Sequence, residues 1–282
     1  MVVDGIDPSV TIESGVTTVS EHPDLTTPGR PAPAHLIIEP VGVDHLGILR
    51  SGKEAQVDLV SYVDDTGATC LVARKRYLPR TVTAKGQLES LGVQRASTFR
   101  HDVGYREGRQ FRKSRDRRAV EGMTTHGRRL LQDRWLHHEY DVMASLWEAG
   151  VLVPYPLSYD SGDEGDRFDM EFVGTEIEAA PRLAEARLHG AALGDAWGQV
   201  RDGLARMVGA GWAHGDLSAY NLLWWDDAVW FIDFPQAVDI AANPQGVDFL
   251  HRDVGNIAEW FIRRGLEVDA EEVFAELLGH WR

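Results

Sequence analysis

Two carboxylates and one amide occur at a spacing suited to metal-dependent phosphoryl transfer. Asp216 follows a His-Gly pair, Asn221 lies five residues further on, and Asp233 ends an apolar run. A phosphoryl group in transfer spreads charge over its oxygens, so catalysis is mostly positioning and charge neutralisation. Asp233 and Asn221 offer the oxygen ligands that Mg²⁺ prefers, and Asp216 can accept the proton of the attacking group. These residue types predict a catalytic Asp216 beside a metal site.

A predicted β-hairpin would bring these three side chains together. Two short apolar runs, residues 222–225 and 229–232, flank the polar pair Asp226-Asp227. A tight turn at that pair joins the runs into antiparallel strands. The amide and the metal-binding carboxylate then stand at the two open ends of the hairpin. The alternative is a core hairpin flanked by solvated carboxylates, and the combined spacing of the three side chains favours the catalytic interpretation.

A second candidate site element is a strand, turn and strand near the start of the ordered sequence. Ala55, Val57 and Leu59 alternate with polar residues, which predicts a strand, and Ser51-Gly52 before it is typical of a turn. Such a turn can cover nucleotide phosphates with its backbone N–H groups. The Walker A spacing is absent, so this is not a P-loop. A lone turn of this kind is weak evidence, because most such turns are only turns.

The next strand, residues 70–77, carries a lysine on its buried face. In an extended strand Ala73, Lys75 and Tyr77 share one face, while Arg74 and Arg76 share the other. The apolar neighbours predict that the lysine points inward. A buried ammonium group needs an anionic partner, and nucleotide phosphates together with a glutamate on a helix would provide one.

Helical spacing of apolar residues appears in four later segments, and one further segment reads as a strand. Glu139 lies near the start of the first helix, which Gly150 ends. Asp269 is a predicted N-cap of the last helix. The predicted helices are residues 135–149, 187–211, 247–264 and 270–281, and the predicted strand is residues 168–174.

Composition restricts the class of protein. The chain has 282 residues, a formal net charge of −15 and one cysteine, Cys70. The single cysteine excludes an intramolecular disulfide and fits a reducing compartment. No apolar run approaches the ~20 residues of a membrane helix, and the first 21 residues lack the features of a signal peptide. We expect a cytoplasmic protein without membrane contact, whose surface is not generally suited to nucleic acids.

Two segments depart from the composition of the rest. Residues 1–40 are rich in Thr, Ser, Pro and acids, which predicts a disordered tail whose hydroxyls could be sites of self-phosphorylation or inert. The stretch Arg100–Arg134 contains eleven Arg or Lys residues with aromatic residues nearby. It could contact RNA, a ribosomal particle or a phosphorylated partner. It could equally be a solvated loop that pairs with the acidic body.

Several of these motifs together resemble one family. The runs HGDLSAYN and IDFPQAVD, with GKEA-x-V near the first turn, resemble the RIO family of atypical serine/threonine protein kinases. The resemblance is to the compact, RIO1-like form without a winged-helix domain. Typical protein kinases have H-R-D and D-F-G here, and aminoglycoside phosphotransferases do not normally continue with P-Q-x-V. Arg50 and Asp58 stand where the family usually has other residues around the phosphate-binding loop.

The resemblance implies a role for each candidate residue. Asp216 would be the proton acceptor, and Asn221 and Asp233 would hold Mg²⁺, or Mn²⁺ in its place. Lys75 would reach the phosphates of ATP and pair with Glu139. The remaining ATP-binding positions would be Ser51, Gly52 and Lys53 at the phosphates, Val57, Ala73 and Met170 in the pocket, and the main chain of Glu171 and Val173 at the adenine. Asp253 would brace the catalytic loop.

The resemblance also implies a fold and a function. We expect an α+β, two-lobed protein-kinase-like fold, with an antiparallel-sheet N-lobe at residues 41–173, a basic flexible segment within it at 78–134, and a reduced helical C-lobe at 174–282. The implied activity is phosphoryl transfer from ATP to Ser or Thr of a protein substrate or of the chain itself, or an autophosphorylating ATPase switch, in ribosome maturation. The alternatives are an aminoglycoside-type phosphotransferase and a non-catalytic scaffold.

Overall fold

A five-stranded antiparallel sheet forms the first half of the protein. The computed structural model describes residues 30–52, 55–77, 125–162, 165–176 and 178–281. The strands follow the order β1-β2-β3-β5-β4 across the sheet. Their bounds are β1 Gly42–Ser51, β2 Ala55–Val63, β3 Thr69–Tyr77, β4 Pro156–Gly162 and β5 Gly165–Glu171.

The register of the central strands decides which side chains share a face. The turn between β2 and β3 is fixed by Asp64, whose carboxylate accepts the amide of Thr66 at 2.9 Å and that of Ala68 at 2.9 Å. From this turn the pairing runs without a break and sets Val57 opposite Lys75. Lys75 in turn lies opposite Phe168 on β5. The alternation predicted from sequence is therefore present, and Lys75 points toward the interior of the protein.

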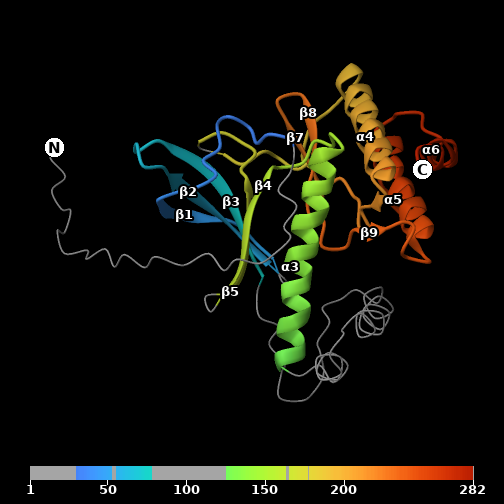
Figure 1. The fold of residues 1–282 in the computed structure, drawn as a ribbon. Helices are drawn as coiled ribbons and strands as arrows, with labels where there is room; N and C mark the ends of the chain where they lie inside the picture. Colours follow the sequence, from blue (N-terminus) through green and yellow to red (C-terminus); the bar gives the residue numbers. More distant parts are fainter. Residues whose placement is uncertain (1–29, 53–54, 78–124, 163–164, 177, 282) are drawn as a thin grey trace, which may run out of the picture.

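One long helix, α3 (Thr125–Glu148), stands between the sheet and the helical half of the molecule (Figure 1). The apolar periodicity predicted that this helix starts at residue 135, and residues 78–134 were expected to form a flexible segment. That boundary is wrong, because the helix begins ten residues earlier. Residues 125–134 are rich in Arg and lack an apolar stripe, so periodicity could not mark them. Gly150, with φ 76°, reverses the chain after the helix.

The described part of the second half contains three helices, one short strand pair and the predicted hairpin. The hairpin turn at Asp226 and Asp227 has φ 50° and 54°, as a two-residue turn with both residues left-handed requires. The three helices predicted in this half are present, and each of them ends two or three residues earlier than expected. The elements are α4 (Ala191–Gly209), β6 (Trp212–Ala213), β7 (Leu222–Trp225), β8 (Ala228–Phe231), β9 (Val238–Asp239), α5 (Gly246–Ile262) and α6 (Ala270–Leu278).

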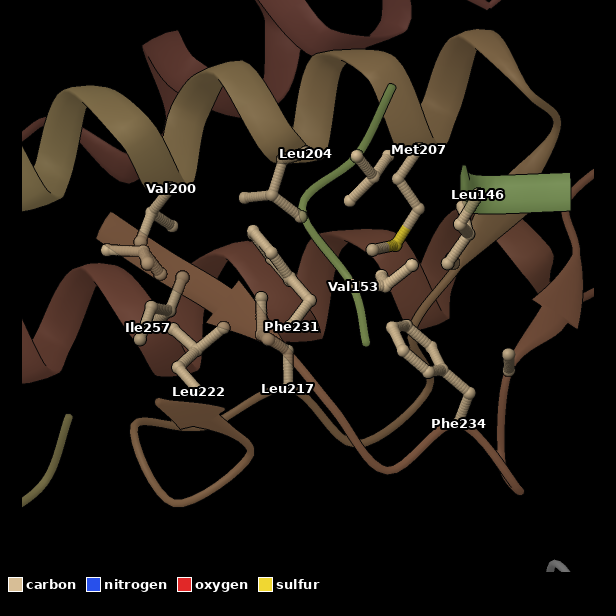
Figure 2. Close-up of a cluster of buried hydrophobic side chains, with 14 of the residues drawn as sticks. Leu146, Val153, Val200, Leu204, Met207, Leu217, Leu222, Phe231, Phe234 and Ile257 are labelled. Atoms are coloured by element: carbon tan, nitrogen blue, oxygen red, sulfur yellow. The ribbon is translucent and has the colours of Figure 1, made fainter. Parts of the chain in front are cut away.

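The main core fills the space between the hairpin and helices α4 and α5. Figure 2 shows Phe231 of β8 pointing toward α4, with Leu204 above it and Leu217 below. All three side chains are buried. Gly203 of α4 makes room for the ring, since a Cβ there would lie 2.3 Å from Phe231 Cε2. This packing fixes the hairpin, and with it the loop that precedes it, to the helical half.

Residues 30–40, which the sequence assigned to a disordered tail, lie against α3 and the sheet. The amide of Arg30 donates to Glu148 Oε1 at 2.6 Å, and its guanidinium lies 4.2 Å from the centre of the Trp147 ring. The amide of Ile37 donates to Cys70 Sγ at 3.2 Å. The segment has no apolar periodicity, so only these long-range contacts reveal that it packs.

Residues 1–29 and 78–124 lie outside the described part of the chain. Most of the predicted disordered tail falls on the first of these ranges, and most of the predicted flexible basic segment falls on the second. None of the helices in the described part is long and apolar enough to cross a membrane.

Candidate active site

The catalytic loop is shaped by a glycine that touches the segment after the hairpin. Gly215 has φ +82°, and a Cβ there would lie 2.0 Å from the carbonyl oxygen of Gln236. No other residue fits this backbone conformation and this close approach. The loop is also tied to the hairpin by His214, whose Nε2 lies 3.1 Å from the carbonyl oxygen of Ile232. The H-G-D and P-Q runs, 20 residues apart, therefore form one packed unit.

Helix α5 braces the same loop with a buried carboxylate. Asp253 accepts the amide of Gly215 at 2.7 Å and that of Leu217 at 2.9 Å. Its side chain is fully buried, and this burial raises the pKa of its carboxyl although the two N–H groups act in the opposite direction. Arg252 donates to the carbonyl of Gly215. The brace expected at Asp253 is present, and Arg252 adds a contact that the sequence did not suggest.

The loop carries Asp216 and Asn221, and a hydrogen bond from the Asn221 amide to the Asp216 carbonyl joins them. Asp216 is exposed, and its Oδ2 lies 3.4 Å from Gln236 Nε2. Desolvation nevertheless raises the pKa of the Asp216 carboxyl, while the charge of Arg252 lowers it. Asn221 donates from Nδ2 to the carbonyl of Asp216 at 2.8 Å. That bond orients the amide, so that Asn221 Oδ1 remains available as a neutral oxygen ligand.

Lys75 joins the sheet, helix α3 and the hairpin. Its Nζ lies 2.8 and 3.0 Å from the two carboxylate oxygens of Glu139 and 2.7 Å from Asp233 Oδ1. The side chain of Lys75 is 7% exposed and that of Glu139 is 1% exposed. Tyr77 also donates its hydroxyl to Glu139. The ion pair expected between Lys75 and Glu139 is present, and Tyr77 is a partner that the sequence analysis missed.

Asp233 is positioned as an open ligand rather than a buried one. Its side chain is 43% exposed, and its φ of 72° is unusual for a residue other than glycine. The charge of Lys75 lowers the pKa of the Asp233 carboxyl, with burial acting in the opposite direction. The Ile232 amide, next to it, donates to the carbonyl of Asn221 at 3.1 Å. The hairpin thus brings its two ends together as predicted.

Helix α3 also holds the segment that follows Asp233. Glu139 Oε1 accepts the amide of Phe234 at 3.2 Å. His138 Nε2 lies 2.8 Å from the carbonyl oxygen of Ala237. Local sequence pattern does not predict this contact of His138, because its partner lies 99 residues away. A single helix therefore positions both Lys75 and the segment that follows Asp233.

The oxygen donors fit a divalent cation that is shared with phosphates. Within the described ranges no group of three His, Cys, Asp or Glu side chains could hold a metal ion alone. Asp233 supplies one exposed anionic oxygen and Asn221 one oriented amide oxygen. Mg²⁺ commonly binds through one or two carboxylates plus substrate phosphates. The donor set suits this arrangement and not a site built from protein ligands only.

The structure describes most of the residues that are predicted to bind the nucleotide. Val57 and Ala73 share the inner face of the sheet with Lys75, and Met170 lies opposite Ala73. The Gly52 amide donates to the carbonyl of Ala55 at 2.9 Å and closes the turn that begins at Ser51. Lys53 lies outside the described residues.

The predicted adenine-binding segment has some of its main-chain groups already in use. The carbonyl of Val173 accepts the amide of Ala180 at 2.9 Å, so Val173 can offer adenine only its N–H. The Glu171 amide donates to the carbonyl of Tyr155 at 2.9 Å. The buried Glu171 carboxylate accepts the Tyr155 amide at 3.0 Å and lies 3.3 Å from His35. The side chain of Glu171 therefore anchors the segment.

The helical half also has an acidic hollow, which lies apart from the predicted site residues. It is lined by Glu267, Asp269, Glu272 and Glu276 between α4 and α6. None of the predicted site residues lines it. An aminoglycoside-type enzyme would need an acidic substrate pocket beside its catalytic aspartate, and this hollow does not provide one at Asp216.

Comparison with known proteins places these residues in a family. The RIO domain family matches residues 97–273. The RIO-type serine/threonine-protein kinase Rio1 of Haloferax volcanii is 33% identical over 184 residues, which cover 65% of this chain and 58% of that protein. Rio1 of Thermoplasma acidophilum is 32% identical over 139 residues, which cover 49% of this chain and 69% of that protein. Human serine/threonine-protein kinase RIO3 is 28% identical over 148 residues, which cover 51% of this chain and 28% of that protein.

The chain thus spans a little over half of the Haloferax protein and about two thirds of the Thermoplasma protein. Kinase relatives imply, in general terms, ATP and a divalent metal as the chemical requirements of such a site. The matched family segment covers more than half of the chain and includes Glu139, Asp216, Asn221, Asp233 and Asp253. The chain therefore belongs to the RIO family, and the relatives that it matches are named serine/threonine-protein kinases.

Proposed function

We propose that this protein transfers the γ-phosphoryl group of ATP to serine or threonine hydroxyls, including its own, with Mg²⁺ bound at Asn221 and Asp233. One observation carries the proposal. Lys75 contacts both Glu139 and Asp233, which joins the phosphate-binding strand to the metal-binding segment. A scaffold without catalysis would gain nothing from this arrangement, because buried ion pairs contribute little net stability.

The chain's own residues divide the reaction between them. The acceptor oxygen forms a bond to the γ-phosphorus while the bond from that phosphorus to the ADP oxygen breaks. Asp216 accepts the proton of the acceptor hydroxyl. Lys75 supplies positive charge to the phosphate oxygens, and Asn221 and Asp233 hold the cation. Mg²⁺, or Mn²⁺ in its place, neutralises charge on the transferring group when it is bound.

The short connection between β9 and α5 favours free phosphate as a second product. Only residues 240–245 separate β9 from α5, which leaves little surface to hold a peptide acceptor. Water can then replace the hydroxyl acceptor at the exposed Asp216. The protein would in that case act as an ATPase switch that releases ADP and free phosphate.

The test follows labelled phosphate from γ-labelled ATP with Mg²⁺ into protein, water and added kanamycin. We expect acid-stable label on protein or free phosphate, both lost in Asp216→Asn and Asp233→Asn. Asp226→Asn in the exposed hairpin turn is the matched control and should keep full activity, since Asn tolerates a left-handed backbone. Label on kanamycin would replace this proposal with a small-molecule phosphotransferase. Nucleotide binding without turnover would leave a scaffold.

Contact with a ribosomal particle or RNA is a separate proposal that rests on the composition of Arg100–Arg134. Phosphate contacts by arginine make such binding strongly salt-dependent. Cosedimentation with ribosomal subunits, compared between the wild type and a variant with Arg112, Arg115 and Arg117 changed to Gln, tests it. Unchanged binding of the variant would contradict it.

A further inference from the structure

An arginine lies on the same face of the sheet as Lys75. Arg50 lies near the end of β1 and pairs with Val57, which pairs with Lys75 on the next strand. Side chains that lie opposite one another on neighbouring strands project from the same face of a sheet. Arg50, Val57 and Lys75 therefore form one row on the inner face. Lys75 is occupied by Glu139 and Asp233, whereas Arg50 is exposed.

A second arginine reaches the catalytic loop from the other lobe. Arg182 forms a bridge with Leu223 of the hairpin, and its Nη1 donates to the carbonyl of Tyr220. Tyr220 directly precedes Asn221 and is 61% exposed. The Arg182 guanidinium is thus held at the edge of the loop that carries Asp216.

Arg50 and Arg182 bring two positive charges to the site. Burial lowers the pKa of Arg182, and the positive charge of Arg50 lowers it further. Asp233 and Glu185 act in the opposite direction, and Lys75 already pairs with Asp233. Within the described part of the chain neither Arg50 nor Arg182 has an acidic side chain at ion-pair distance. Two arginines beside the site, with no acidic side chain at ion-pair distance in the described chain, favour an anionic partner that binds from outside.

We propose that Arg50 and Arg182 select acceptors with carboxylates next to the Ser or Thr, and that residues 1–29 of this chain are such an acceptor. The inference rests on the proposed function and names its substrate class. A basic acceptor would bring like charge to both arginines, whereas an acidic one would pair with them near Asp216. The transfer itself is the reaction already described, with the acceptor proton moving to Asp216.

The sequence of residues 1–29 has the required composition. It contains no Lys or Arg and eight Ser or Thr residues. Its five acidic residues are Asp4, Asp7, Glu13, Glu21 and Asp24. Fully extended, 29 residues reach about 100 Å, which exceeds the roughly 40 Å width expected of a folded domain of this size. The segment can therefore reach the site of its own chain or of a second copy.

The experiment compares two peptides as acceptors for the full-length protein. One peptide has the sequence of residues 9–28, and the other has Lys in place of Glu13, Glu21 and Asp24. The wild type should favour the acidic peptide in kcat/KM by at least about tenfold, which corresponds to about 1.4 kcal/mol. Mass spectrometry of the protein after incubation with ATP should find phosphate within residues 1–29.

Three variants connect the preference to the arginines. Arg50→Gln and Arg182→Gln should each remove most of the preference, and Arg182→Glu should reverse it toward the Lys peptide. Arg187→Gln is the matched control, because Arg187 is exposed and lies outside the catalytic loop; it should behave as the wild type. Because Arg50 lies at an exposed strand end, its variant tests the inference even if the Arg182 variants fold poorly.

Each other outcome overturns the inference. Equal kcat/KM for both peptides in the wild type would show that charge does not select the acceptor. A raised KM for ATP with an unchanged peptide ratio in the arginine variants would assign both arginines to the nucleotide. ATP hydrolysis without label on either peptide would overturn the inference and leave the ATPase form of the proposed function. Absence of any ATP turnover would overturn the proposed function itself.

Discussion

Replacing Lys75 by methionine should lower stability and abolish transfer, and a second change at Glu139 should restore stability alone. The ammonium group of Lys75 lies 2.8 Å from Glu139 Oε1 and 2.7 Å from Asp233 Oδ1. Methionine has a similar length but no charge. Its introduction leaves Glu139, with a side chain 1% exposed, as an uncompensated buried carboxylate.

The expected size of the effect follows from the remaining contacts. Removing one partner of a buried ion pair typically costs about 3–5 kcal/mol. Glu139 keeps the Tyr77 hydroxyl and the Phe234 amide as donors, and Asp233 is exposed enough to be hydrated. We therefore expect Lys75→Met to lower the free energy of unfolding by about 3 kcal/mol, near the lower end of this range. Removing the buried charge in Lys75→Met/Glu139→Gln should return about 1–2 kcal/mol of this loss.

The assay is urea unfolding followed by tryptophan fluorescence, together with phosphate transfer from labelled ATP. The chain has nine tryptophans, so unfolding of both lobes is visible. Both variants should lack transfer, since neither supplies a cation to the phosphates. If Lys75→Met/Glu139→Gln is no more stable than Lys75→Met, the buried charge of Glu139 is not what makes the single change costly, and the reasoning fails.

Three further predictions concern the site and its support. Gly215→Ala should abolish activity, because its Cβ would lie 2.0 Å from the carbonyl oxygen of Gln236; transfer assays check this. Gly203→Ala should lower the free energy of unfolding by about 1–3 kcal/mol in urea, because its Cβ would overlap the Phe231 ring. The value of kcat should fall with decreasing pH at a midpoint above the usual aspartate pKa of about 3.9, since desolvation raises the pKa of Asp216 and only its ionised form accepts a proton.

Two helical glycines with open space around them serve as controls. Gly255→Ala in α5 and Gly198→Ala in α4 place a Cβ in open space and should be neutral or raise stability by about 0.5–1 kcal/mol. Equal effects at Gly203 and Gly198 would contradict the role of the close contact. A pH profile of kcat with its acid limb at or below the usual aspartate value would contradict the environment assigned to Asp216.

Local pattern predicted the parts of the site that neighbouring residues define. The hairpin followed from two apolar runs around Asp226-Asp227, and it accounts for the meeting of Asn221 with the segment of Asp233. The inward face of Lys75 followed from strand alternation. Its pairing with Glu139 came from family resemblance, since no spacing rule joins residues 64 positions apart.

The contacts that were missed are long-range and carry no local signal. His138 reaches Ala237, and Arg30 reaches Trp147, across about a hundred residues each. Nothing in the periodicity of either segment distinguishes such a contact from solvent exposure. The early start of α3 was missed for a related reason. A helix whose first turns carry no apolar stripe cannot be recognised by burial patterns.

We expect Asp233 to hold the cation and Asp216 to act only on the acceptor. Calorimetric titration with ATP, with and without Mg²⁺, tests it on the wild type, Asp233→Asn and Asp216→Asn. We predict that Asp233→Asn loses the Mg²⁺-dependent part of ATP affinity, and that Asp216→Asn binds ATP as the wild type does but transfers no phosphate. Wild-type Mg²⁺ dependence in Asp233→Asn would contradict this division of roles, and so would transfer by Asp216→Asn.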